Sequence, residues 1–209
     1  MTAVRLFGAR YSVYTRIARL VLAEAEIACT LEEVDIFRPE TVPAAYADRH
    51  PFGKIPALEH GGLRLYETDA IAAYVAALSD AGRRLLPADA VADARMRQLM
   101  RVMDNYVYPA CVWGVYVPES EGAAAIGDDA RAAAERTLDA VAALASAPYL
   151  QGAAPTLADL WAVAMLVYLE LVPTGRGLLE SRPHLRDWLA TMQARPSLVA
   201  TRYPAEPGG

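Results

Sequence analysis

Three short stretches carry side chains whose types and spacing could hold a ligand and act on it. The first is YSVYTRIARL at residues 11–20, a hydroxyl-rich turn at the start of an amphipathic segment. Ser12 and Thr15 are both N-cap candidates, because a hydroxyl oxygen accepts a hydrogen bond from an unpaired N–H of the first helical turn. A hydroxyl at a helix N-terminus also stabilises an anionic sulfur, and the field there lowers the pKa of a thiol. The stretch therefore fits either a simple cap or a site that activates a thiol.

The second stretch is YETDAI, in which Glu67 and Thr68 precede an apolar helical run. The purely structural interpretation is that Thr68 caps the helix and that Glu67 is the last, exposed residue of a strand. Helix N-termini bind carboxylates, and an acid beside them attracts an ammonium group. The pair therefore fits a ligand end that carries both groups, as an α-amino acid does.

The third stretch is HPFGKIPALEHGG, residues 50–62. Pro56 stands where a strand begins, and a proline is tolerated as the first residue of a strand or on an edge. The alternative is a cis Ile55–Pro56 bond that turns the backbone of Ile55 outward, where an extended peptide could pair with it as an added strand. We predict the cis bond.

These stretches belong to elements whose order predicts a compact α/β layer followed by helices only. The apolar periodicity predicts, in order, strand 3–7, helix 15–24, strand 29–36, a hairpin around Gly61-Gly62 and helix 68–78. We expect an N-terminal domain at 1–79, a linker at 80–88, an all-helical domain at 89–203 and a disordered tail at 204–209.

The helical half predicts an apolar cleft on a long helix interrupted by Pro109, which should kink that helix. The region is rich in large side chains: Met103, Tyr106, Tyr108, Trp113 and Tyr116. Ordinary core or dimer packing explains any single one of them. As a set beside a proline they favour a hydrophobic substrate site, to which Tyr11 would contribute from the other domain.

Composition excludes several classes of function. The 209 residues carry a formal net charge of −5 and no run of basic residues, which argues against nucleic-acid binding. No apolar stretch is long enough to predict a membrane span. The two cysteines have no metal-binding or dithiol spacing, so we expect no metal site and no disulfide framework. We expect a soluble cytoplasmic protein.

Taken in their order along the chain, the three stretches resemble the cytosolic glutathione S-transferase family over essentially the whole chain. HPFGKIPALEHGG is similar to its Pro-x-Gly-x-(Val/Ile)-Pro segment, YETDAI to its (Glu)-Ser/Thr-x-Ala-Ile segment, and SVYTRIAR to the motif of serine-type, phi/theta-like bacterial members. GAAPTLADL resembles the capping box of the family, with Thr156 reciprocated by Asp159. Residues 182–201 resemble its C-terminal helix.

The resemblance implies an α/β thioredoxin-like N-terminal domain plus an all-α C-terminal domain. It implies glutathione as co-substrate, held by the backbone of Ile55 behind cis-Pro56, with Glu67 and Thr68 on the γ-glutamyl group and Lys54 near the glycine carboxylate. Ser12 would stabilise the thiolate, and Tyr11 is its nearest rival. The partner in the reaction would be a small hydrophobic electrophile, as in detoxification, with peroxide reduction as a further activity.

Other implications and departures complete these expectations. The resemblance implies a homodimer, and Phe52 is an apolar loop residue that could insert between helices of the partner. His50 replaces the usual asparagine, and the loop FRPET lacks the basic pair of phi-like members, with Arg38 as its substitute. The alternative function is a binding or regulatory protein that keeps the fold and does not catalyse.

Overall fold

The structure is a computed structural model that describes residues 3–209. Its contacts divide the chain into two compact units, one running up to Leu85 and taking in Ala200–Gly209, the other spanning Leu86–Val199. The stretch expected to be a linker holds a short helix, α3 (Asp80–Arg83), which the Ser79 hydroxyl caps.

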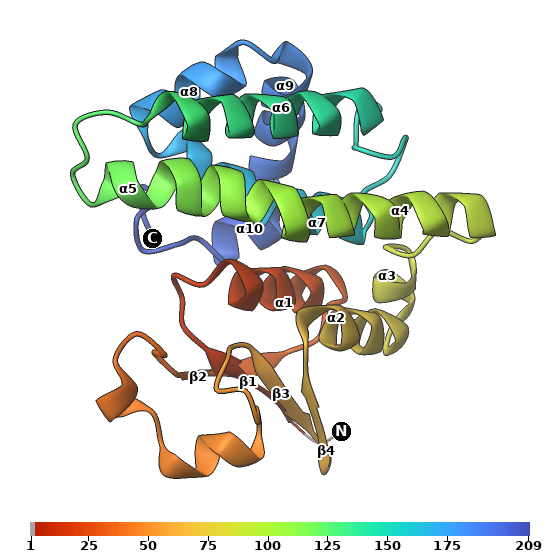
Figure 1. The fold of residues 1–209 in the computed structure, drawn as a ribbon. Helices are drawn as coiled ribbons and strands as arrows, with labels where there is room; N and C mark the ends of the chain where they lie inside the picture. Colours follow the sequence, from red (N-terminus) through yellow and green to blue (C-terminus); the bar gives the residue numbers. More distant parts are fainter. Residues whose placement is uncertain (1–2) are drawn as a thin grey trace. The chain divides into compact units, whose positions relative to one another are not determined.

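The first unit is a four-stranded mixed sheet with helices (Figure 1). Strand order is β2-β1-β3-β4, in which β1 and β2 are parallel and the β1–β3 and β3–β4 pairs are antiparallel. The elements are β1 (Val4–Gly8), α1 (Val13–Glu24), β2 (Cys29–Glu33), η1 (Pro39–Thr41), η2 (Ala44–Asp48), β3 (Ala57–His60), β4 (Leu63–Tyr66) and α2 (Thr68–Ala77). This is the thioredoxin-like arrangement that was expected, with β2 ending earlier than predicted.

The core of this unit follows from the alternation of its strands. Leu6 of β1 pairs with Leu58 of β3, and both are buried. Helices α1 and α2 lie along one face of the sheet (Figure 1). The predicted hairpin is confirmed: Gly61 and Gly62 join β3 to β4, both with positive φ, which suits the tight turn of a two-residue loop.

The second unit consists of helices. They are α4 (Ala90–Val102), η3 (Met103–Tyr116), α5 (Val117–Ser120), α6 (Asp128–Leu144), α7 (Leu157–Glu170), α8 (Pro173–Glu180), α9 (Pro183–Gln193) and α10 (Pro196–Ala200). Three of them begin with proline, which suits the first helical position because its missing N–H would have no partner there. Pro109 lies inside η3, which is wound as a π-helix, the form that accommodates local disruption of the α ladder.

Helix α7 is the centre of the second unit. Every residue of this helix except Glu170 is buried. The predicted capping box is present at its start, where Asp159 accepts from the backbone N–H of Thr156 at 2.8 Å. The same buried carboxylate accepts from the backbone N–H of Leu150 and from the indole of Trp188, both at 2.9 Å. The Thr156 hydroxyl also donates to it at 3.1 Å, and these four donors make a charge inside the core tolerable.

The expectation of a disordered tail at 204–209 is wrong at Glu206, and Tyr203 just before it is also held in place. Tyr203 is completely buried, and Glu206 forms an ion pair with Arg16 of α1. The sequence lacks periodicity there because the segment is held by individual side chains and not by a helical stripe.

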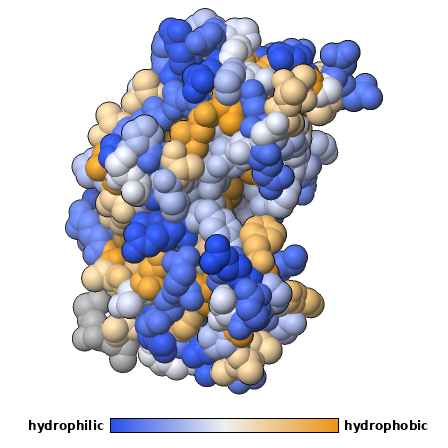
Figure 2. Space-filling view, turned by 90° about the vertical axis from the view of Figure 1, so that its left-hand side faces the viewer, coloured by the Kyte–Doolittle hydropathy of each residue, from blue (hydrophilic) through white to orange (hydrophobic). Residues whose placement is uncertain are grey.

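The surface mixes residue types. Figure 2 shows hydrophilic and hydrophobic residues interspersed on the face that it displays. Phe52 and Phe37, both in the first unit, are the most exposed of the large hydrophobic residues, at 70% and 66%. Within residues 3–209, none of the helices is long and apolar enough to cross a bilayer.

Candidate functional site

The start of α1 presents the Ser12 hydroxyl. Ser12 is the N-cap residue, with extended backbone angles (φ −75°, ψ 128°), and its hydroxyl oxygen accepts from the backbone N–H of Thr15 at 3.2 Å. The residue is half-buried, so its hydroxyl serves as a cap and remains accessible from solvent. Because the hydroxyl proton is not used by the cap bond, it can be donated to a nearby anion.

Thr15, the other hydroxyl of this turn, has no exposed surface. It packs against the end of β1, where a Cβ on Gly8 would lie 2.3 Å from the Thr15 Oγ1 atom. Glycine at position 8 therefore lets the strand end approach the helix start closely. This contact fixes the position of the α1 N-terminus relative to the sheet.

The rival hydroxyl, that of Tyr11, donates to the Asp35 carboxylate in the loop after β2. The pKa of Tyr11 is raised, first by desolvation and then by the hydrogen bond to Asp35 and its charge. Its ring stacks on Phe37 with centroids 5.8 Å apart. A phenol whose proton is committed to a carboxylate is a poor donor to a second anion.

The loop before β3 is held by a hydrogen bond from a buried tyrosine. The Tyr46 hydroxyl donates to the Lys54 carbonyl oxygen at 2.7 Å, and Tyr46 itself is buried. The Ile55–Pro56 bond is cis, as predicted, and the side chains of both residues are buried while Lys54 is exposed. Arg38, the other cation expected near the glycyl end, lies 3.6 Å from Asp35 and is largely exposed.

The start of α2 differs from the prediction by one residue. Glu67, and not Thr68, is the N-cap, with φ 68° and ψ 117°. Positive φ is costly for a residue with a Cβ, and it turns the chain so that helical geometry begins at Thr68. The exposed Glu67 side chain makes no cap bond, whereas Thr68 is buried. Such strain persists where the surrounding structure enforces it, commonly at ligand sites.

His50 lies beside this corner and was missed as a site residue. It is buried, and its ring packs on Tyr66 with centroids 5.0 Å apart. Burial lowers the pKa of His50; Glu67 opposes this shift and Lys54 adds to it. The imidazole therefore lies in the electrostatic field of two residues that were predicted to bind the ligand. Its replacement of an asparagine was the only sequence signal.

Two further residues escaped sequence reasoning. Asp35, which engages Tyr11, and Phe37, which stacks on it, lie 24 and 26 positions further along the chain. An acidic residue after the second strand is a weak sequence signal. Only the pairing of the first two strands brings it close to the hydroxyl-rich turn that follows the first strand.

The aromatic set of the second unit separates into distinct contacts. Tyr108 and Trp113 meet edge to face with centroids 6.3 Å apart, and Tyr116 packs on Tyr168 at 4.2 Å. Burial raises the pKa of both Tyr108 and Tyr116. Met103 is fully buried and belongs to the core of the second unit.

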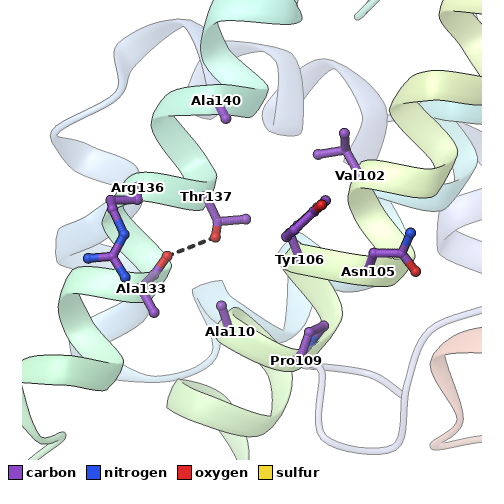
Figure 3. A pocket seen from close by; sticks show the side chains of 9 residues that line it. All are labelled: Val102, Asn105, Tyr106, Pro109, Ala110, Ala133, Arg136, Thr137 and Ala140. Carbon is purple, nitrogen blue, oxygen red and sulfur yellow. Dashed lines mark hydrogen bonds between the residues drawn. The ribbon is translucent and has the colours of Figure 1, made fainter.

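Tyr106 faces a different hollow. Its exposed ring stands between η3 and α6, as Figure 3 shows, in a groove of about 610 Å³. Thr137 faces the same space and donates its hydroxyl to the Ala133 carbonyl at 2.7 Å. The groove is lined by Val102, Asn105, Tyr106, Pro109, Ala110, Ala133, Arg136, Thr137 and Ala140. It is mainly apolar and wide enough for an aromatic side chain.

Comparison with known proteins shows which family the chain resembles. Residues 6–83 match the family model of the glutathione S-transferase N-terminal domain, and residues 107–196 match that of the C-terminal domain. Glutathione S-transferase F11 of Arabidopsis thaliana is 30% identical over 202 residues, covering 93% of this chain and 94% of the relative. The chain belongs to the glutathione S-transferase family.

Other members of the family agree over the same length. The transferase APIC of Nicotiana tabacum is 30% identical, covering 94% of this chain and 96% of its own. The solved structure of glutathione S-transferase III in its apo form superimposes with a TM-score of 0.79 at 30% identity, covering 98% of this chain and 99% of that one. The thioredoxin-like plus helical fold of the transferases is thus established. Within residues 3–209, no three His, Cys, Asp or Glu side chains are grouped as a metal site.

Proposed function

We propose that this protein is a serine-type, phi-like glutathione transferase. The Ser12 hydroxyl donates to the glutathione sulfur, which is ionised at neutral pH and attacks a small hydrophobic electrophile or a peroxide oxygen. Its two cysteines are free, as is usual in the reducing cytoplasm, where we propose that it works. Curated relatives named as transferases support the reaction class.

One observation carries the choice of Ser12. Ser12 is half-buried at the α1 N-terminus and its hydroxyl has a proton to donate, whereas the Tyr11 hydroxyl is engaged by Asp35 and Thr15 is buried. Lowering a thiol pKa from about 8.5 to about 6.5 needs roughly 2.7 kcal/mol of preference for the thiolate. A hydrogen bond to a charged acceptor supplies about 1.5–3 kcal/mol, and the helix N-terminus adds about 0.3–1 kcal/mol.

The remaining predicted residues give the tripeptide an orientation. The backbone of Ile55, turned by cis-Pro56, pairs with the cysteinyl residue; Glu67 and Thr68 hold the γ-glutamyl end, and Lys54 and Arg38 face the glycine carboxylate. The electrophile lies against the aromatic residues of η3, of which Trp113 is the most exposed after Tyr106.

The test is the ultraviolet absorbance of the thiolate as a function of pH, at saturating glutathione. We expect a midpoint about two units below that of free glutathione. A midpoint equal to that of the free thiol refutes thiol activation and favours the non-catalytic alternative. If glutathione-agarose also fails to retain the protein, the ligand proposal itself is refuted.

We also propose a homodimer in which Phe52 of one copy enters the groove between η3 and α6 of the other. Phe52 is 70% exposed, with His50 and Tyr66 as edge-on neighbours at 6.2 and 6.1 Å. Leaving a large apolar side chain in water costs roughly 1.5–3 kcal/mol relative to burying it. An apolar groove of suitable size in the same molecule offers that burial.

Light scattering at micromolar concentration checks the dimer. We expect Phe52→Ser to yield monomers, and Ala140→Trp, which fills the groove, to do the same. Phe37→Ser removes an equally exposed phenylalanine of the same unit and should stay dimeric. A parent protein of monomeric mass, or a dimeric Phe52→Ser, contradicts the proposal.

A further inference from the structure

Helix α1 contains a buried charge that the proposed reaction does not use. Arg16 follows Ser12 by four residues and is 1% exposed, although arginine is almost never fully buried without a partner. Its backbone N–H donates to the Ser12 carbonyl at 2.9 Å, the first bond of the helix. The charge therefore lies one turn from the hydroxyl proposed to hold the sulfur.

The partners of Arg16 come from the end of the chain. Its guanidinium donates to both carboxylate oxygens of Glu206 and lies over the Tyr203 ring, 4.2 Å from the centroid. Glu206 is itself held in place, since its Oε1 accepts from the Tyr203 backbone N–H at 2.7 Å. The side chains of this pair are 0% and 10% exposed, so water screens the pair weakly.

A second arginine ties the same segment to α1. Arg19, one turn further along, donates to the carbonyl oxygens of Ala200 and Thr201, both at 3.2 Å. The pKa of Arg19 is lowered, first by burial and then by the charges of Arg10 and Arg16. Three cations thus lie on α1 and the turn before it.

Two carboxylates bond to this part of the chain. Glu33 accepts from the Arg10 backbone N–H at 3.2 Å, on the side of the turn nearest β2. On the opposite side, Glu206 is the carboxylate in contact with Arg16. Side chains on a helix lean toward its N-terminus, which for Arg16 is the end that Ser12 caps. Glu206 consequently offsets a positive charge carried near the start of α1.

We propose that the C-terminal segment 200–206 sets the reactivity of the bound thiol, with Glu206 moderating the positive field that Arg16 adds at Ser12. Arg16 and Glu206 are positioning residues that act through the start of α1, and neither contacts the sulfur. The proposal rests on the proposed function, because it requires glutathione with its sulfur at Ser12.

The sign of the effect follows from charge alone. A guanidinium stays protonated throughout the relevant pH range, so removing the Glu206 charge makes the charge balance around the start of α1 more positive. That balance favours the ionised sulfur, and the thiol pKa falls. For charges on the order of 10–15 Å apart in a partly buried site, the shift is on the order of half to one pKa unit.

The experiment is the thiolate titration at saturating glutathione and low ionic strength for the parent and for Glu206→Gln. Glutamine keeps the shape and the acceptor for Tyr203. We expect the midpoint to fall by half to one unit. Glu206→Asp, which retains the charge, should match the parent, and so should Glu180→Gln, which removes an exposed carboxylate from the other unit. An unchanged or raised midpoint in Glu206→Gln overturns the proposal.

A double variant guards against loss of folding, because breaking one half of a buried ion pair can destabilise a protein severely. Replacing Arg16 and Glu206 together by methionine removes both charges and is often tolerated. Its midpoint should lie at or above that of the parent, and a lower one overturns the proposal. If the parent itself shows no lowered thiol pKa, the proposed function fails first, which separates the two failures.

Discussion

Helices α1 and α2 of the first unit begin with different backbone angles and different caps. Ser12 begins α1 with ordinary extended angles and a side-chain cap bond of 3.2 Å. Glu67 begins α2 with positive φ and no side-chain cap. The first start is satisfied within the chain and has a proton to offer, whereas the second is strained and keeps its carboxylate free for other contacts. The difference fits the tasks that the proposed function gives them: reactivity at α1 and affinity at α2.

The largest effect should come from the strained start. Glu67→Ala removes a charge-assisted hydrogen bond to the γ-glutamyl end, worth about 1.5–3 kcal/mol, so glutathione should bind roughly 10–150-fold more weakly. Isothermal titration calorimetry measures this loss. The thiol pKa of the glutathione that still binds should be unchanged, because the change is made at the other helix. A large shift in the pKa of the bound thiol in this variant would contradict the assignment of affinity to α2 and reactivity to α1.

Ser12→Ala should have the opposite profile. Loss of the hydroxyl bond should raise the pKa of the bound thiol by about one to two units, while affinity changes little. Loss of the cap should also lower the free energy of unfolding by about 1 kcal/mol. Ser12→Asp separates the two roles, because aspartate caps equally well and repels a thiolate: stability should be kept and the pKa raised. If Ser12→Ala leaves the titration midpoint in place, the role passes to Tyr11 or to backbone N–H groups.

Replacing Glu67 and Ser12 by glycine, one at a time, compares the backbone strain at the two helix starts. Glu67→Gly should raise the free energy of unfolding by about 0.5–1 kcal/mol, because positive φ costs roughly 1–3 kcal/mol for other residues and part of the gain is lost to chain entropy. Ser12→Gly should lower it by a few tenths of a kcal/mol, since glycine is itself an acceptable cap. Thermal unfolding of both variants decides this, and equal signs would contradict it.

The smallest effect concerns pH. His50, beside Glu67, has a lowered pKa because burial disfavours its charged form. The folded state therefore binds the proton less readily than the unfolded chain, and the stability of the first unit should fall as pH drops below about 6.5. His50→Gln should reduce that fall, whereas His184→Gln, at an exposed position, should not. Urea unfolding at pH 7.5 and 5.5 measures the difference.

Some features of the fold and the site could be predicted from the sequence, and others could not. The Gly61-Gly62 hairpin, the cis Ile55–Pro56 bond and the Asp159 capping box depend on residues a few positions apart, and all three were predicted correctly. The strain at Glu67 could not be read, because a glutamate carries no signal of positive φ. The Tyr11–Asp35 and Arg16–Glu206 contacts join residues 24 and 190 positions apart, so they depend on tertiary packing that local patterns do not encode.

Helix α7 has a consequence for how the protein opens. Its residues up to Leu169 are buried, and the carboxylate of Asp159 binds its first turn to Leu150 and Trp188. No partial fraying of the second unit exposes such a helix, so its amide protons should exchange with deuterium only when the whole unit unfolds. Exchange at the centre of α7 would then report the global free energy of that unit, while the start of α2 would exchange through small local openings. Bound glutathione should slow the second process and leave the first nearly unchanged.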